Sequence, residues 1–297
     1  MRTLKKITGI IITFAIIAVM LAGCGENTAT INMATKPMTE QYILGSMMKT
    51  LIEQDTDLTV HVTTGVGGGT SNIHPAMEKG DFDFYPEYTG TTWNAVLKED
   101  SLYDESMFHE LQKGYDAMDM AWTGMVGFNN TYGIAVTKEI ADKYHLKTYS
   151  DLAAVSNELT FGAEYDFFER EDGYQALCDT YGLTFKDTKD MDIGLKYDAI
   201  NQKQVDVMNI FTTDGQLAVS DIVVLEDDKG LYPSYVCGFI VRNEILDKYP
   251  ELQSVFDKVE NLITDAEMAE LNYQVEGEGA EPEAVAQEFL KEKGLLK

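Results

Sequence analysis

The chain has 297 residues, of which 50 are acidic and 23 are basic, so its formal net charge at pH 7 is −27. So negative a protein is repelled by nucleic acids and by anionic lipid surfaces, which argues against both as partners. A chain of this length can bury a large hydrophobic core, and in α/β proteins such a core is usually split between two lobes.

The N-terminus is typical of a targeting segment. A basic start and the apolar run 7–20 lead to the sequence Leu-Ala-Gly-Cys at 21–24, which reads as a bacterial lipobox. Residues 1–23 are therefore predicted to be a lipoprotein signal peptide, and Cys24 to carry the lipid. An uncleaved membrane anchor is the alternative, although the apolar run is short for a span. Either interpretation places the rest of the chain on the extracytoplasmic face of the bacterial membrane.

After a small, polar tether at 24–30, predicted strands and helices alternate along the chain. Residues 39–51 show the clearest helical pattern, because their apolar residues fall on one side. Predicted strands are 31–35, 58–62, 159–162, 205–211 and 222–225, and predicted helices are 39–51, 72–79, 107–120, 174–181, 251–264, 266–273 and 284–290.

The stretch 81–91 combines a predicted strand with a predicted helix start. Acidic and aromatic residues alternate over its first four positions, which is typical of a strand with one buried face. Pro86 is expected to end this strand, and Thr89 or Thr91 can cap the apolar run 93–97. A strand that leads through an aromatic hydroxyl and a glycine into a helix is where open α/β sheets bind ligands.

Two segments are predicted to cross between lobes. Residues 125–136 look like a strand broken by polar residues in its middle, and residues 236–241 look like the return crossing. The resulting prediction is an α/β fold with a split first lobe and a continuous second lobe. Its predicted boundaries are 31–129 and 236–297 for lobe 1, and 130–235 for lobe 2.

The sequence at 83–91, Asp-Phe-Tyr-Pro-Glu-Tyr-Thr-Gly-Thr, resembles the signature of the osmoprotectant-binding lipoproteins of ABC importers. This family captures glycine betaine, carnitine, choline and related quaternary ammonium compounds. The resemblance implies a periplasmic-binding-protein-like fold of type II, with two crossing strands as the hinge and the ligand in the cleft between the lobes. Further matching blocks follow in order at 35–41, 128–132, 161–164, 170–173, 212–215 and 233–235.

The resemblance also implies a cage of aromatic rings in the cleft. A quaternary ammonium has no N–H, so ring faces and desolvated packing must hold it. At about 0.5–2 kcal/mol for each desolvated ring, four rings would supply a large part of the roughly 8 kcal/mol behind micromolar binding. Phe211 stands where the family commonly has Tyr, which keeps the ring face and loses a hydroxyl. The implied walls are Tyr88, Tyr132, Phe211 and Tyr235.

The remaining ligand contacts implied by the resemblance are polar. Asn130 occupies a position where an acid also occurs in the family, and a neutral side chain there weakens the bias toward a cation. For the other end of the ligand, the matching positions are Thr91, Arg170, and Lys36 or Gln41. The planar fork of Arg170 suits a carboxylate and would favour zwitterions over choline. The alternative is that Arg170 pairs with an acid of the protein.

An enzyme is not expected. The chain has four scattered histidines without metal-ligand spacing and no Gly-x-Ser-x-Gly motif, and neither Cys178 nor Cys237 has an adjacent base. The prediction is a monomeric, lipid-anchored binding protein without cofactor or metal, which delivers a quaternary ammonium compound to an ABC permease with its ATPase. The alternatives are a binding protein for another amine or an amino acid, and a surface sensor or adhesion lipoprotein.

Overall fold

The structure is a computed structural model. Cys24, Arg170 and the predicted signal peptide 1–23 lie outside the residues that it describes, which are 28–169, 173–192, 195–232 and 234–296. Within these ranges, every helix is too short or too polar to cross a lipid bilayer.

The first five-stranded sheet has the order β2-β1-β3-β10-β4. Strands β1, β2 and β3 run parallel to one another, and β10 runs antiparallel to β3 and β4. Strand β10 therefore joins this sheet from a distant part of the chain. The strands are β1 (Thr30–Ala34), β2 (Thr59–Thr63), β3 (Phe84–Tyr88), β4 (Met120–Thr123) and β10 (Cys237–Arg242).

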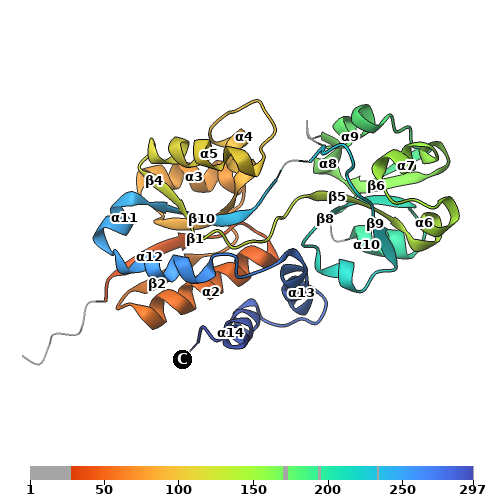
Figure 1. Ribbon diagram of the computed structural model, residues 1–297. Helices are drawn as coiled ribbons and strands as arrows, with labels where there is room; N and C mark the ends of the chain where they lie inside the picture. Colours follow the sequence, from red (N-terminus) through yellow and green to blue (C-terminus); the bar gives the residue numbers. More distant parts are fainter. Residues whose placement is uncertain (1–27, 170–172, 193–194, 233, 297) are drawn as a thin grey trace, which may run out of the picture.

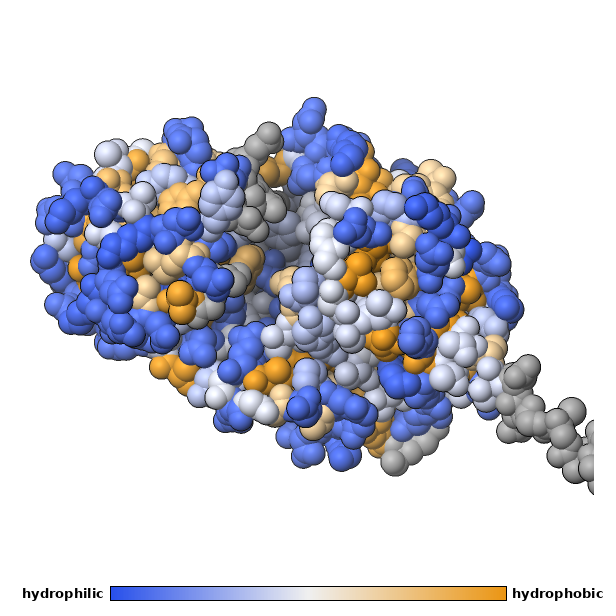
Figure 2. All heavy atoms as spheres, turned by 180° about the vertical axis from the view of Figure 1, so that it is seen from behind, coloured by the Kyte–Doolittle hydropathy of each residue, from blue (hydrophilic) through white to orange (hydrophobic). Residues whose placement is uncertain are grey.

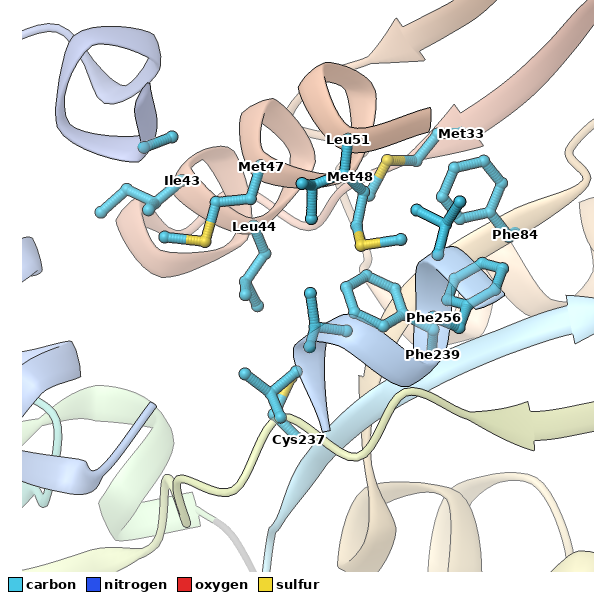
Figure 3. Close-up of a cluster of buried hydrophobic side chains, with 14 of the residues drawn as sticks. Met33, Ile43, Leu44, Met47, Met48, Leu51, Phe84, Cys237, Phe239 and Phe256 are labelled. Carbon is cyan, nitrogen blue, oxygen red and sulfur yellow. The ribbon is translucent and has the colours of Figure 1, made fainter. Parts of the chain in front are cut away.

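Helices cover both faces of the first sheet (Figure 1). On one face, the apolar side of α2 packs toward Phe239 and Phe256, with Leu44, Met47 and Met48 among its buried residues (Figure 3). The periodic pattern of 39–51 thus predicted this face of α2 correctly. The helices are α2 (Thr39–Asp55), α3 (Thr70–Lys79), α4 (Thr89–Ala95), η1 (Glu105–Met107), α5 (Phe108–Asp116), α11 (Asn243–Lys248), α12 (Glu251–Phe256), η5 (Asp257–Val259), α13 (Asp265–Glu276) and α14 (Pro282–Glu292).

The second five-stranded sheet has the order β7-β6-β8-β5-β9. Strand β5 is antiparallel to β8 and β9, whereas β6 is parallel to β7 and β8. The strands are β5 (Tyr132–Thr137), β6 (Thr160–Glu164), β7 (Asp187–Met191), β8 (Val207–Phe211) and β9 (Ile222–Val224). The helices are α6 (Lys138–Tyr144), α7 (Tyr149–Ala153), η2 (Ser156–Glu158), α8 (Tyr165–Glu169), α9 (Tyr174–Tyr181), α10 (Lys196–Asn201) and η4 (Gly215–Ala218).

Two antiparallel segments connect the sheets, one leading into β5 and one leading into β10 (Figure 1). They meet at a β-bridge between Asn129 and Val236. The backbone N–H of Asn130 donates to the carbonyl oxygen of Tyr235 at 3.2 Å, and the N–H of Tyr235 donates to Oδ1 of Asn129 at 2.7 Å. The predicted α/β fold with two crossings is therefore confirmed.

Helix α13 also joins the two sheets, although it follows β10 in the chain. Nδ2 of Asn272 in α13 donates to the carbonyl oxygen of Thr213, which follows β8, at 2.8 Å. A Cβ atom at Gly215 would lie 2.5 Å from the backbone nitrogen of Tyr273, so only glycine allows this approach. The contact fixes one side of the space between the sheets.

Several predicted elements differ from the structure. Pro86 lies inside β3 and does not end it. Proline lacks a backbone N–H, but β1 pairs with β3 only at Phe84, so no hydrogen bond from residue 86 to β1 is lost. Thr89 begins α4 instead of capping it, and its Oγ1 accepts a hydrogen bond from the N–H of Val236 at 3.1 Å. Strand β7 was not predicted, since its residues are polar and mostly exposed and show no period-2 pattern.

Candidate ligand-binding site

A cavity of about 210 Å³ is lined by residues from both sheets and from the crossing segments, and we call it the ring cavity. From behind, the molecular surface is mostly hydrophilic and is hollowed near its middle (Figure 2). Residues that lie far apart in the sequence meet at the ring cavity, so its shape depends on how the two sheets are placed. Its lining residues are Lys36, Met38, Tyr88, Thr91, Asn130, Tyr132, Phe211 and Tyr235.

Tyr88 is the last residue of β3, the middle strand of the first sheet. Its hydroxyl donates to Oε1 of Glu40 and accepts a hydrogen bond from Nε2 of Gln41 at 3.0 Å. Burial raises the pKa of Tyr88 well above its ordinary value, so the hydroxyl keeps its proton. These two bonds to α2 fix the orientation of the ring.

Tyr132 and Phe211 form the wall contributed by the second sheet. They are the first residue of β5 and the last residue of β8, and they stand opposite each other in the antiparallel pair. Their ring centroids are 4.8 Å apart with an interplanar angle of 32°, and Tyr132 also contacts Phe167 and Tyr232. Ring packing therefore holds this wall.

Tyr235 lies on the crossing segment that precedes β10 and is the fourth ring of the ring cavity. Its side chain packs against Gly90 in α4, where a Cβ atom would lie 2.9 Å from a ring carbon of Tyr235 and 2.5 Å from the carbonyl oxygen of Ser234. Thr91 follows at once and lines the ring cavity. The absence of a side chain at Gly90 is thus what lets the ring lie against α4.

A buried ion pair lies behind Tyr88. Nζ of Lys36 is hydrogen-bonded to Oε1 of Glu87, and the two side chains are 9% and 0% exposed. The carboxylate of Glu87 also accepts from the hydroxyl of Thr70 at 2.6 Å and from the backbone N–H of Tyr88 at 2.8 Å. Nζ of Lys36 lies 4.8 Å from the centroid of the Tyr88 ring, so this ring already contacts an ammonium group.

A second buried lysine lies beside Phe211. Nζ of Lys196 is 3.2 Å from Oδ2 of Asp214 and 5.0 Å from the centroid of the Phe211 ring. The same carboxylate oxygen accepts from the hydroxyl of Tyr197 at 2.9 Å and from the backbone N–H of Phe211 at 3.0 Å. Asp214 therefore ties the end of β8 to α10.

Glu40 links the walls of the site to one another. Its Oε1 accepts from Tyr88 and from Nδ2 of Asn130 at 2.7 Å, while its Oε2 accepts from Oγ1 of Thr213 at 2.7 Å and from Nδ2 of Asn272 at 3.5 Å. Burial raises the pKa of Glu40, and these four donors act in the opposite direction. One carboxylate thus joins α2, the crossing segment, the loop after β8, and α13.

The structure brings most of the predicted ligand contacts together. Gln41 is fully buried and does not line the ring cavity, but it supports the cavity from behind through Tyr88 and through the N–H of Lys36, which donates to Oε1 of Gln41 at 3.2 Å. Arg170 lies outside the described residues. The predicted residues that line the ring cavity are Lys36, Tyr88, Thr91, Asn130, Tyr132, Phe211 and Tyr235.

Four charged residues at the site were not predicted, and one of them is Asp214 in the loop after β8. Glu87 lies within the signature stretch 83–91, and Glu40 lies in the first turn of α2, where an acid also serves the helix dipole. Lys196 lies in no motif, and only its burial of 99% identifies it. No three histidine, cysteine, aspartate or glutamate side chains in the described part of the chain form a metal site, and Cys178 and Cys237 are free.

Residues 29–292 match the family described as the substrate-binding domain of ABC-type glycine betaine transport systems (OpuAC). The chain is 44% identical over 264 residues to the ergothioneine transport permease/ergothioneine binding protein EgtU of Helicobacter pylori (strain G27). The match covers 89% of this chain and 47% of EgtU, so the chain spans about half the length of that relative. It is 38% identical over 271 residues to the carnitine transport binding protein OpuCC of Listeria monocytogenes, with coverage of 90% and 88%.

A solved structure described as a glycine betaine/carnitine/choline ABC transporter superimposes with a TM-score of 0.83 at 35% identity. The superposition covers 90% of this chain and 100% of the solved one. The predicted periplasmic-binding-protein-like fold is therefore confirmed.

Proposed function

The chain belongs to the family of substrate-binding domains of ABC-type glycine betaine transport systems, and from this membership we propose that it binds a quaternary ammonium compound in the ring cavity. Its relatives are transport binding proteins, so the chain is the substrate-binding component of an ABC importer and not an enzyme.

The observation that carries this proposal is the convergence of four rings, from both sheets and from a crossing segment, on one small cavity. A quaternary ammonium cannot donate a hydrogen bond, so only ring faces and close apolar packing distinguish it from a primary amine. Each desolvated ring contributes about 0.5–2 kcal/mol to such a cation. Glu40, Gln41 and ring packing hold Tyr88, Tyr132 and Phe211 in place, so these side chains need little ordering on binding.

The relatives suggest which quaternary ammonium compounds to test. Their names refer to ergothioneine, carnitine and glycine betaine, which all combine a trimethylammonium group with a carboxylate. Lys36 also lines the ring cavity, and its ammonium is paired with Glu87. Arg170 remains a predicted carboxylate partner. We therefore propose a zwitterionic betaine, rather than choline, as the ligand.

Delivery to the importer completes the proposal. Residues 1–23 would be removed as a signal peptide, and the lipid on Cys24 with the tether 24–30 would hold the protein at the extracytoplasmic face of the membrane. The monomer would close lobe 1 (31–129 and 236–297) on lobe 2 (130–235) by a hinge motion in the crossing segments. The closed form would then pass the ligand to a permease with its ATPase.

Calorimetry with glycine betaine and carnitine tests the proposed site. Tyr88→Ala and Tyr235→Ala should each weaken binding by about 2-fold to 30-fold, since each removes one ring face. Tyr144→Ala serves as the control, because Tyr144 lies on α6 and is absent from the lining of the ring cavity. Unchanged affinity in both cavity variants would refute the cage.

A further inference from the structure

A second cavity, of about 580 Å³, adjoins the ring cavity. Met38, Asn130 and Phe211 line both cavities, and the remaining walls of the second one come from the start of α2, α10, the loop after β8, and α13. Sites for small molecules commonly measure about 300–1,000 Å³, so the ring cavity alone is small and the second cavity lies within the usual range. The ring cavity thus has the size of one end of a longer site.

Three buried polar atoms on residues of the second cavity make no hydrogen bond to any described residue. They are Nζ of Lys196, Oδ1 of Asn130 and Oδ1 of Asn272. The three residues are 1%, 8% and 5% exposed. Buried polar atoms nearly always have a partner, because leaving one unpaired costs its desolvation. These atoms are one donor and two acceptors that lack a partner, on residues that line the second cavity.

The carboxylate of Glu40 sets the direction of the two amides. Nδ2 of Asn130 donates to Glu40 at 2.7 Å, and Nδ2 of Asn272 donates to the carbonyl oxygen of Thr213 at 2.8 Å. A carboxylate and a carbonyl only accept hydrogen bonds, so each amide must turn its NH₂ group toward them. Both Oδ1 atoms are then left as acceptors, which N–H or O–H groups of a ligand or of water can satisfy.

Lys196 is a buried donor that lacks an acceptor among the described residues. Its ammonium is close to Asp214, but their geometry is not that of a hydrogen bond, and Oδ2 of Asp214 already accepts from Tyr197 and Phe211. Beside its ion pair with Asp214, the ammonium of Lys196 can therefore donate a hydrogen bond to an acceptor on a ligand. Glu276 also lines this cavity and adds acceptor oxygens to its wall.

We infer that the two cavities form one site for a betaine with a polar tail. The quaternary ammonium head occupies the ring cavity, and the tail reaches the second cavity with N–H or O–H donors for Asn130 and Asn272 and an acceptor for Lys196. This inference rests on the proposed function and deepens it. Glycine betaine has no N–H or O–H group, so it satisfies the head end of the site and leaves the two amide oxygens unpaired.

Two matched pairs of ligands test the inference by calorimetry on the wild-type protein. Carnitine differs from γ-trimethylammoniobutyrate by one hydroxyl, and Nα,Nα,Nα-trimethylhistidine differs from Nα,Nα,Nα-trimethylphenylalanine in having a ring N–H. In at least one pair, the donor-bearing member should bind about 5-fold to 100-fold more tightly, since it pairs a buried acceptor. Equal affinities within both pairs would overturn the inference.

Lys196→Met and Asn272→Leu provide the second test. Each should reduce the ratio of the affinities for trimethylhistidine and glycine betaine by about 5-fold or more. Because the ratio is measured within one variant, a general loss of folded protein cancels. An unchanged ratio in both variants would overturn the inference and leave the proposed function standing, whereas a wild-type protein that binds no quaternary ammonium compound would overturn both.

Discussion

In each of the two sheets, the middle strand ends at an aromatic residue that lines the ring cavity. A buried lysine lies close to that aromatic ring. In the first sheet the ring is Tyr88, and Nζ of Lys36 lies 4.8 Å from its centroid. In the second sheet the ring is Phe211, and Nζ of Lys196 lies 5.0 Å away. In both, the carboxylate that pairs with the lysine also accepts a hydrogen bond from the backbone N–H of the ring residue.

The two arrangements differ in how many of their polar atoms are satisfied. Lys36 is hydrogen-bonded to Glu87, and the hydroxyl of Tyr88 is held by Glu40 and Gln41. Nζ of Lys196 has no hydrogen bond to a described residue, and Phe211 has no hydroxyl to anchor. The first half of the site is therefore complete without a ligand, and the second half leaves a donor for one. Rings alone do not reveal this difference, because it lies in the polar atoms around them.

Replacing Lys36 or Lys196 should change the stability of the protein, and by different amounts for the two lysines. Lys36→Met leaves Glu87 buried without its counter-ion, which should cost about 3–5 kcal/mol of unfolding free energy. Lys196→Met should cost about 1–3 kcal/mol, because the Asp214 side chain is 21% exposed and keeps two other donors.

Urea unfolding of both variants measures this difference. Lys203→Met is the matched control, since Lys203 pairs with Glu139 at the surface with both side chains mostly exposed, and it should change stability by about 0–1 kcal/mol. Equal losses for Lys36→Met and Lys196→Met would contradict the comparison.

A smaller effect is expected from exchanging the two ring types. Tyr88→Phe removes a donor from the buried carboxylate of Glu40 and should lower the unfolding free energy by about 1–3 kcal/mol. Phe211→Tyr adds a hydroxyl to a ring that lines open cavity, and its effect on stability should stay within about 0.5 kcal/mol. Thermal unfolding measures both, and a Tyr88→Phe variant as stable as the wild type would show that the anchoring bonds contribute nothing.

A further expected effect is a change in the pH dependence of stability. Burial raises the pKa of Glu40 above its ordinary value of 4.5, so the folded protein binds this proton more tightly than the unfolded chain does. The contribution is fully present below pH 4.5 and is lost as the pH rises through the raised pKa. Glu40→Gln lacks this titration.

Unfolding curves of the wild type and Glu40→Gln between about pH 4 and about pH 8 check this sign. The difference in stability, wild type minus variant, should fall as the pH rises. A difference that grows with pH would mean that Glu40 is stabilised as a carboxylate, and that its four donors outweigh its burial.

The sequence predicted the α/β fold and the rings more fully than it predicted the charges around them. Tyr88 could be placed because a strand pattern, a glycine and a helix start surround it. Lys196 could not, because only long-range packing buries a lysine at the start of an otherwise ordinary helix. The same reason applies to β7, whose polar residues form a strand only because β6 offers an open edge.

A crystal structure of the complex with glycine betaine would show whether the four rings hold the head group of the ligand. The N-methyl carbons should lie within about 6 Å of the ring centroids of Tyr88, Tyr132, Phe211 and Tyr235, with no hydrogen bond to the nitrogen. A ligand bound outside the ring cavity, or one whose methyl groups point away from these rings, would contradict it.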